Sequence, residues 1–329
     1  MSTQPWADQA PRRTEVASEQ DWCAGMWALP TLPSVLFRFL GLVGDPGVGT
    51  LELAEFIWKD PALLSRALPM ASAPSMATSE EGGSLRAAVA DLGRQRLRNL
   101  AFTTPLLRSL EPVGLGAYAL TFWERSLLCA VVCEAAARHL HLPGPERYYV
   151  AGLVHDVGYL VLLQKRPSLL PIIFQRWASQ PSRLLEIEKE LIGMDHCQMG
   201  LEAASTLGLD PWLYPTISDH HSPTEDSDLA SRLTCIASVF CNYQGLDLLP
   251  RRSLSRGARE RELHEVIRVL LPSRSGEEQA RLLEEMEGAA RPVRHAIRQA
   301  VLEWELSGES RGLPELGRHS ARSAGPVIV

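Results

Sequence analysis

The stretch AGLVHDVGYL, residues 151–160, places a histidine and an aspartate, His155 and Asp156, in the middle of an apolar segment. On a helix, two adjacent side chains differ by about 100° in direction, so both can reach one centre that lies between them. Imidazole and carboxylate are good ligands for divalent cations, and such a pair can help to hold a metal ion. The same pair can also be a buried polar contact that only stabilises a core.

Outward from this stretch, the chain reads as one amphipathic helix after another. Apolar residues recur at spacings of three and four in LELAEFIWKDPALLSRAL (51–68), SLRAAVADLGRQRLRNLAF (84–102), FWERSLLCAVVCEAAARHL (122–140) and SRLLEIEKELIGM (182–194). Alternating runs of Val, Ile and Thr, which would indicate strands, are absent from the sequence. The predicted fold class is therefore all-α.

Turn signals and composition divide the chain into five predicted parts. These are a flexible arm (1–25), an N-terminal helical subdomain (26–110), a second helical subdomain with the His and Asp clusters (111–245), C-terminal amphipathic helices (258–306) and a disordered tail (307–329). The C-terminal helices are expected at 259–271, 277–288 and 291–306. We expect them to pack back on the core rather than to present a face to a partner.

Composition excludes several classes of protein. The 329 residues are 45% hydrophobic and 22% charged, as in ordinary globular proteins, and the net charge of -6 disfavours broad binding to nucleic acid. The first twenty residues lack the apolar core of a secretory signal, and no apolar run is long enough for a membrane span, so a cytoplasmic protein is expected. The arginine-rich linker PRRSLSRGARERE (250–262) contains no aromatic residue and is predicted to be a solvated face.

The six cysteines include no C-x-x-C pair. We therefore interpret them as small buried side chains in a reducing compartment, with zinc ligation as the minor alternative.

Two further polar clusters follow His155 and Asp156 in the same subdomain. They are the pair Asp195 and His196 and the pair His220 and His221. A helical phosphohydrolase needs imidazole and carboxylate ligands that converge from several helices on a metal ion, which then activates a water molecule. Buried His and Asp side chains can instead satisfy one another and form a polar lock.

Several spaced motifs in a consistent order resemble the HDOD family, the HD-related output domains of bacterial signalling proteins. They are LPTLPSVLFRFLGLVGDP (29–46), KDPALLSR (59–66), AGLVHDVGYLVLL (151–163) and LIGMDHCQMGLEAASTLGLDPWLYPTISDHHSP (191–223). The resemblance covers about two thirds of the chain, from Leu29 to Asn242. It implies an N-terminal helical bundle packed on an HD-like helical subdomain, related in fold to the HD phosphohydrolases.

The HD phosphohydrolases bind metal through a histidine, the His-Asp pair and a distant aspartate, and this resemblance can be tested at each position. The first histidine is replaced by Arg125 and the distant aspartate by Ser238, while Tyr159 replaces a lysine that is common in cyclic dinucleotide phosphodiesterases. Losing two ligands removes both coordination and charge, and arginine is a permanent cation. Arg125 is expected to pair with Asp156 in place of a metal.

These departures predict a vestigial pocket with no catalytic residue, no metal and no cofactor. Its predicted members are Arg125, His155, Asp156, Asp195, His196, His220, His221 and Ser238.

The resemblance implies a non-catalytic regulatory protein that acts as an adaptor or output module. The chain has no GGDEF, EAL or kinase motif, so it is expected to act through a separate protein partner in bacterial signalling, such as a cyclic di-GMP enzyme, a kinase or a response regulator. The alternative is a metal-dependent phosphohydrolase of nucleotides or cyclic dinucleotides. That activity requires Asp195, His196, His220 or His221 to replace the missing ligands. Nucleic-acid binding through the arginine-rich linker is the third possibility.

Overall fold

The structure is a computed structural model that describes residues 39, 42–43, 45–71, 85–103, 115–180, 183–246 and 255–306. Within these ranges all regular structure is helical and no strand is present, which confirms the all-α prediction. The predicted arm (1–25) and tail (307–329) lie outside the described residues. None of the described helices combines the length and the apolar character that crossing a bilayer would need.

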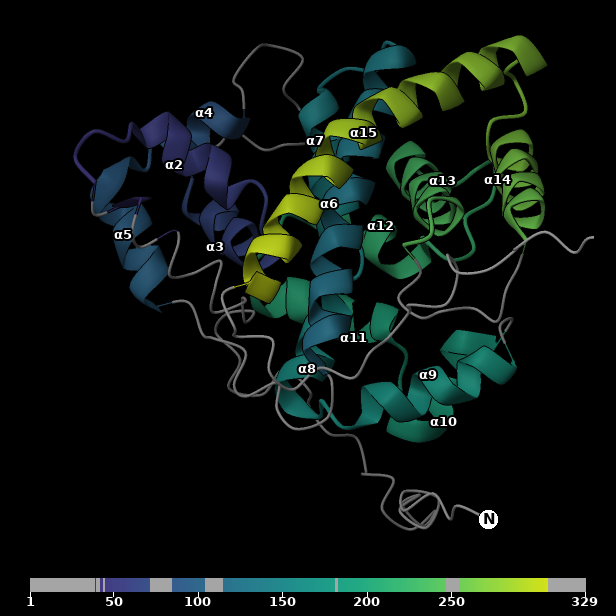
Figure 1. Cartoon of the computed structure of the whole chain (residues 1–329), viewed down its shortest axis with the longest axis horizontal. Helices are drawn as coiled ribbons and strands as arrows, with labels where there is room; N and C mark the ends of the chain where they lie inside the picture. The colour runs from purple at the N-terminus through teal and green to yellow at the C-terminus, as the bar shows by residue number, and fades with distance from the viewer. Residues whose placement is uncertain are drawn as a thin grey trace, which may run out of the picture.

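Four N-terminal helices form a group at one side of the molecule (Figure 1). They are α2 (Thr50–Ile57), α3 (Pro61–Met70), α4 (Leu85–Ala90) and α5 (Gly93–Thr103).

The KDP motif explains where α3 begins. Asp60 caps the helix by accepting from Leu63 N at 2.7 Å, and Pro61 takes the first helical position, where no backbone donor is needed. Asp60 also accepts from Trp123 Nε1 at 2.6 Å, so this cap joins the N-terminal group to α6 (Leu115–His139).

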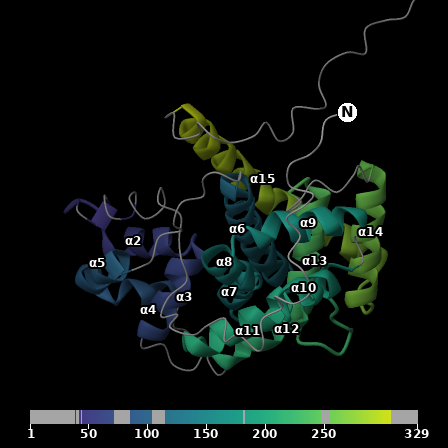
Figure 2. The same ribbon diagram turned by 90° about the horizontal axis from the view of Figure 1, so that it is seen from below.

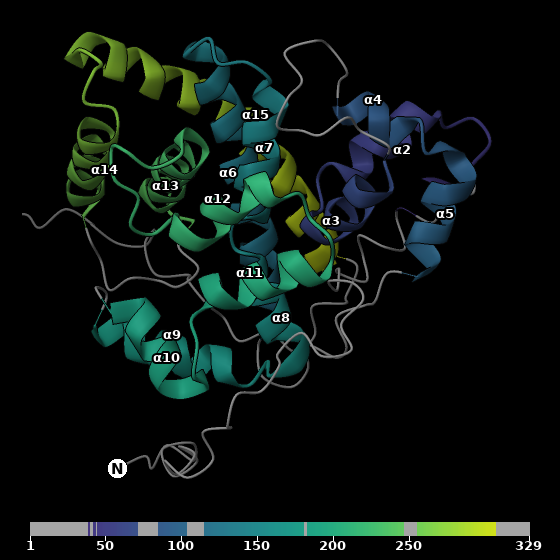
Figure 3. The same ribbon diagram turned by 180° about the vertical axis from the view of Figure 1, so that it is seen from behind.

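Further helices follow α6 along the chain. They are α7 (Pro145–Val154), α8 (Val157–Lys165), α9 (Leu169–Ser179), α10 (Leu184–Ile192), α11 (His196–Thr206), α12 (Tyr214–Asp219) and α13 (Leu229–Tyr243), with the 3-10 turn η3 (Pro211–Leu213) before α12. Helix α6 packs against α7 and α13, and α8 packs against α11 (Figure 3).

Two helices close the described chain, α14 (Arg256–Leu270) and α15 (Gly276–Leu306). The expected break between 288 and 291 is wrong, because α15 is continuous and contains Pro292. A proline removes one helical hydrogen bond and bends a helix, but packing can hold the two halves together. Helix α15 crosses α6 and is visible in Figure 2 as the long yellow-green helix beside it.

The core has two parts that meet around α6 and α7. The first joins α2, α3, α7, α8, α9 and α11, and the second joins α6, α13, α14 and α15. Leu263, Ile267, Leu282 and Met286 are the C-terminal side chains most deeply buried in the second part, each at most 1% exposed. The C-terminal helices therefore pack on the core, as expected, instead of extending into solvent.

Candidate functional site

The His-Asp pair occupies the junction between two helices. His155 directly follows α7, and Asp156 directly precedes α8. Two residues later, Gly158 lets α8 approach α11 closely, because a Cβ atom at this position would lie 1.9 Å from the carbonyl oxygen of His196. This backbone contact brings the start of α11 beside the carboxylate of Asp156.

Three imidazoles surround the carboxylate of Asp156. The Nε2 atom of His155 lies 3.0 Å from Oδ2, while the Nε2 atoms of His220 and His196 lie 3.2 and 3.4 Å from Oδ1. All four side chains are buried. Burial disfavours the ionised carboxylate, but the three imidazoles outweigh that effect and hold the pKa of Asp156 well below its ordinary value.

Hydrogen bonds at Nδ1 orient the rings of His155 and His220. Nδ1 of His155 lies 2.7 Å from the carbonyl oxygen of Gly152, and Nδ1 of His220 lies 3.1 Å from that of Thr216. A carbonyl oxygen only accepts, so these Nδ1 atoms carry hydrogens and the Nε2 atoms are the ones turned toward Asp156. Both Nε2 atoms face the carboxylate of Asp156, at 3.0 Å for His155 and 3.2 Å for His220. His155, Asp156 and His220 thus bring two imidazole nitrogens and a carboxylate close enough together to hold a cation.

Glu188 on α10 is a site residue that sequence reasoning missed. It is fully buried, and its Oε2 accepts from the backbone N of His196 at 2.9 Å and lies 2.7 Å from Nδ1 of the same residue. Its Oε1 accepts from the hydroxyl of Tyr159 at 2.7 Å. Burial opposes the imidazolium, but the Cys197 sulfur and the Glu188 carboxylate hold the pKa of His196 well above its ordinary value. A signal was present in the sequence, since Glu188 falls on the apolar face of its helix beside Ile187.

Asp195 and His221 have different positions from the rest of the cluster. Asp195 forms a capping box with Gln198 at the start of α11 and pairs with Lys189 Nζ at 2.9 Å, so its carboxylate serves the helix terminus. His221 lies at the rim, where part of the residue is exposed, but its imidazole turns inward and places Nε2 2.9 Å from Nε2 of His196. Burial and the neighbouring imidazoles hold the pKa of His221 well below its ordinary value. Of the proposed replacement ligands, the structure brings together the histidines and leaves Asp195 apart.

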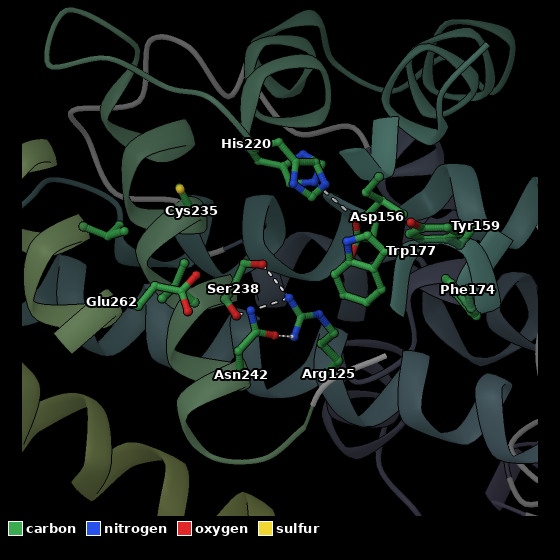
Figure 4. A pocket seen from close by; sticks show the side chains of 14 residues that line it. Arg125, Asp156, Tyr159, Phe174, Trp177, His220, Cys235, Ser238, Asn242 and Glu262 are labelled. Carbon is green, nitrogen blue, oxygen red and sulfur yellow. Dashed lines mark hydrogen bonds and ion pairs between the residues drawn. The ribbon is translucent and has the colours of Figure 1, made fainter. Parts of the chain in front are cut away.

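Arg125 and Ser238 contact each other directly. The Nη2 atom of Arg125 donates to Ser238 Oγ at 2.5 Å and to its carbonyl oxygen at 3.2 Å. Its Nη1 atom donates to Asn242 Oδ1 at 2.7 Å and to the carbonyl oxygen of Leu246 at 2.9 Å. Figure 4 shows this guanidinium directed at Ser238 and Asn242 on α13, while Asp156 is engaged by His220.

The expected ion pair between Arg125 and Asp156 is not formed. The physical reason is that each group already has nearer partners. The acceptors of α13 take the guanidinium hydrogens, and the imidazoles surround the carboxylate.

A cavity of about 280 Å³ connects the two polar groups. Arg125, Asp156, His220 and Ser238 line it together with the aromatic ring of Trp177. The residues at the first and last positions of the HD ligand set do not fit a divalent metal. The buried cation Arg125 takes the first position, and it donates a hydrogen bond to the hydroxyl of Ser238 at the last position.

Comparisons with known proteins agree with this architecture. The family model described as HDOD domain matches residues 29–223. The MmoQ response regulator from Methylococcus capsulatus str. Bath is 22% identical, with a TM-score of 0.51, over 78% of this chain and 98% of that chain. An HDOD domain protein from Geobacter sulfurreducens is 24% identical, with a TM-score of 0.47, over 84% of this chain and 94% of that chain. No curated protein matches the chain. Because the family model spans more than half of its residues, this chain belongs to the HDOD family.

Proposed function

We propose that this HDOD protein is a non-catalytic signal-transduction module that acts through protein-protein contacts. The observation that carries the proposal is the hydrogen bond of 2.5 Å between Arg125 and Ser238. These residues stand at two of the four positions that hold metal in HD phosphohydrolases, and here they bind each other. The guanidinium donates three hydrogen bonds to α13 and one to Leu246, which follows it, so it holds α6 against this segment and leaves those positions with no metal ligand.

A signalling role is also supported by the family and by one protein of the same fold, which is described as a response regulator. The chain lacks GGDEF, EAL and kinase motifs, so its output requires a separate partner. We propose a cyclic di-GMP enzyme, a kinase or a response regulator as that partner. Pairwise two-hybrid tests against these three classes of the host bacterium should yield at least one interaction, and no interaction with any of them would overturn this choice of partner.

The competing proposal is a metal-dependent phosphohydrolase of a nucleotide or cyclic dinucleotide. One observation favours it, which is the convergence of three imidazole Nε2 atoms on the carboxylate of Asp156. The Arg125–Ser238 pair weighs against it, because a fixed positive charge lines the same cavity.

One assay separates the two proposals. The purified full chain is incubated with Mn²⁺, Fe²⁺, Mg²⁺ or Zn²⁺ and with bis(p-nitrophenyl) phosphate, nucleoside monophosphates or cyclic di-GMP. Asp156→Asn serves as the matched variant, because it keeps the shape of the side chain and removes its charge. We expect the same background rate from both proteins. Product release by the wild-type chain that disappears in Asp156→Asn would overturn the non-catalytic proposal and establish the hydrolase.

A further inference from the structure

Arg125 is a buried cation that forms no ion pair with any described carboxylate. Only 6% of the residue is exposed, and its hydrogen bonds go to a hydroxyl, an amide oxygen and two carbonyl oxygens, all of them neutral. Its Nε atom is buried and has no hydrogen-bond partner among the described residues. A buried charge is costly unless an opposite charge lies against it, so this guanidinium lacks the counter-charge that its position requires.

We infer that the cavity lined by Arg125 binds a small monocarboxylate with a flat apolar body. The inference rests on the proposed function for its meaning, since such a ligand is an input signal for a signalling module, but the binding itself is tested separately. The cavity of about 280 Å³ is at the lower end of the range for small-molecule pockets, about 300–1,000 Å³. It therefore suits a ligand much smaller than a cyclic dinucleotide.

The polar end of the cavity offers hydrogen-bond donors to a carboxylate. Ser238 Oγ accepts from Arg125 at 2.5 Å, and its own hydrogen is donated to no described residue. Arginine only donates, so the atom of the Asn242 amide that it contacts at 2.7 Å is the oxygen, and the NH₂ group of that amide has no described acceptor. Figure 4 shows these three side chains together at one end of the cavity. Charge-assisted hydrogen bonds from such donors are what an anion needs.

The cavity also has an aromatic wall. Figure 4 shows Trp177 on one side of the cavity and Ser238 and Asn242 on the other. Phe174 and Leu184 add apolar surface to the lining. An indole presents a broad flat face, on which a planar ring packs in an offset or edge-to-face arrangement. A ligand that joins a carboxylate to a planar apolar body can therefore use the donors and the wall together.

The charges around the cavity favour a ligand with one negative charge. Asp156 and Glu262 also line it, and neither forms an ion pair with Arg125. A carboxylate supplies the single charge that balances the guanidinium. A phosphate monoester carries a charge of about −1.5 to −2 at pH 7, and its surplus would be repelled by the two carboxylates already present.

The test is isothermal titration calorimetry of the full chain with benzoate, in the presence of EDTA so that no metal can hold the carboxylate. Benzoate should bind at one site with a dissociation constant of about 1 mM or tighter, as a well-seated ligand of this size allows. Benzamide has nearly the same shape without the charge, and acetate has the charge without the ring. Each should bind at least about 10-fold more weakly than benzoate, because each loses one of the two kinds of contact. Phenyl phosphate should bind no more tightly than benzoate.

Four variants locate the ligand. Arg125→Met should abolish benzoate binding, and Ser238→Ala and Trp177→Leu should each weaken it by about 10-fold. Arg281→Met is the matched control, because it removes an exposed arginine that pairs with Glu277 on α15, and it should bind benzoate like the wild type. If Arg125→Met does not fold by circular dichroism, the variants of Ser238 and Trp177 decide the result.

Several outcomes would contradict the inference. No saturable binding of benzoate, phenylacetate or indole-3-carboxylate up to about 10 mM would overturn the ligand site. Equal affinities for benzamide and benzoate would overturn the role of the charge, and tighter binding of phenyl phosphate would overturn the carboxylate class. Unchanged binding in both Ser238→Ala and Trp177→Leu would place the ligand outside this cavity. None of these results alters the hydrolysis assay, which uses added metals and tests the proposed function separately.

Discussion

Gly158 is the residue whose replacement tests the architecture of the site most directly. It lies in the first turn of α8, two residues after Asp156, where α8 meets α11. A Cβ atom at this position would be 1.9 Å from the carbonyl oxygen of His196 and 2.9 Å from the backbone N of Gly200. Both obstacles are backbone atoms, so no side-chain rotation can relieve them. In Gly158→Ala, the two helices have to separate by about 1 Å or more, because the interior is too closely packed to absorb the methyl group.

Two effects of opposite sign determine the magnitude. Alanine in place of glycine within a helix stabilises it by about 0.5–1 kcal/mol. Overpacking of a core costs about 1–3 kcal/mol when side chains can adjust, and the obstacle at Gly158 is a rigid backbone on a buried face. We therefore expect a net loss of at least about 3 kcal/mol in the free energy of unfolding, a large part of the 5–15 kcal/mol typical of a folded protein.

Urea unfolding followed by circular dichroism measures this loss. Gly288→Ala is the matched control, because Gly288 is exposed within α15 and a Cβ atom there would meet nothing within 4 Å. The control should be more stable than the wild type by about 0.5–1 kcal/mol. If Gly158→Ala unfolds within about 1 kcal/mol of the wild type with an unchanged m-value, the close contact between α8 and α11 does not exist as described.

Three further predictions concern α6 and the helices packed on it. Arg125→Met removes the guanidinium that Ser238 and the buried Asn242 bind, so urea unfolding should show a loss of about 2–4 kcal/mol, and an unchanged stability would contradict the role of this contact. Burial raises the pKa of Glu124 to about 6, despite the opposing charge of Arg294. The folded chain thus holds this proton more tightly than the unfolded chain, whose ordinary value is 4.5, and stability is lost as the pH rises between these values. Glu124→Gln should remove this loss and be up to about 2 kcal/mol more stable than the wild type at pH 7.5, with little difference at pH 4, and equal unfolding curves at both pH values would refute the shift. Deleting residues 258–306 should expose the apolar faces of α6 and α13 and cause aggregation in size-exclusion chromatography, whereas a monodisperse, helical truncation would show that these helices do not complete the core.

Local patterns were sufficient for most of the helical framework. The KDP motif predicts the start of a helix because Asp60 is an N-cap and Pro61 fits the first position, and the structure shows both. Apolar periodicity also placed the C-terminal helices, but it could not show that α15 continues through Pro292. Whether a proline ends a helix or only bends it depends on the packing of the flanking turns, which is not a local property.

The hydrogen-bond partners of Arg125 could not be predicted from local sequence patterns. The ion pair expected between Arg125 and Asp156 was reasonable by charge, yet the guanidinium binds Ser238 and Asn242. Hydrogen-bond partners over more than a hundred residues of sequence depend on how α6 and α13 pack, and charge alone does not specify that arrangement.

By itself, the sequence determined that this protein is helical, where many of its helices begin, and that His155 and Asp156 stand within a segment typical of the HDOD family. Those features follow from periodicity, capping chemistry and residue identity, all of which are local. Only the tertiary structure decided that Glu188 contacts His196, that Arg125 donates to Ser238, and that three imidazoles surround the carboxylate of Asp156. The physical reason is that burial and hydrogen bonding act over distances of a few ångströms in space, between groups that the packing of distant helices brings together.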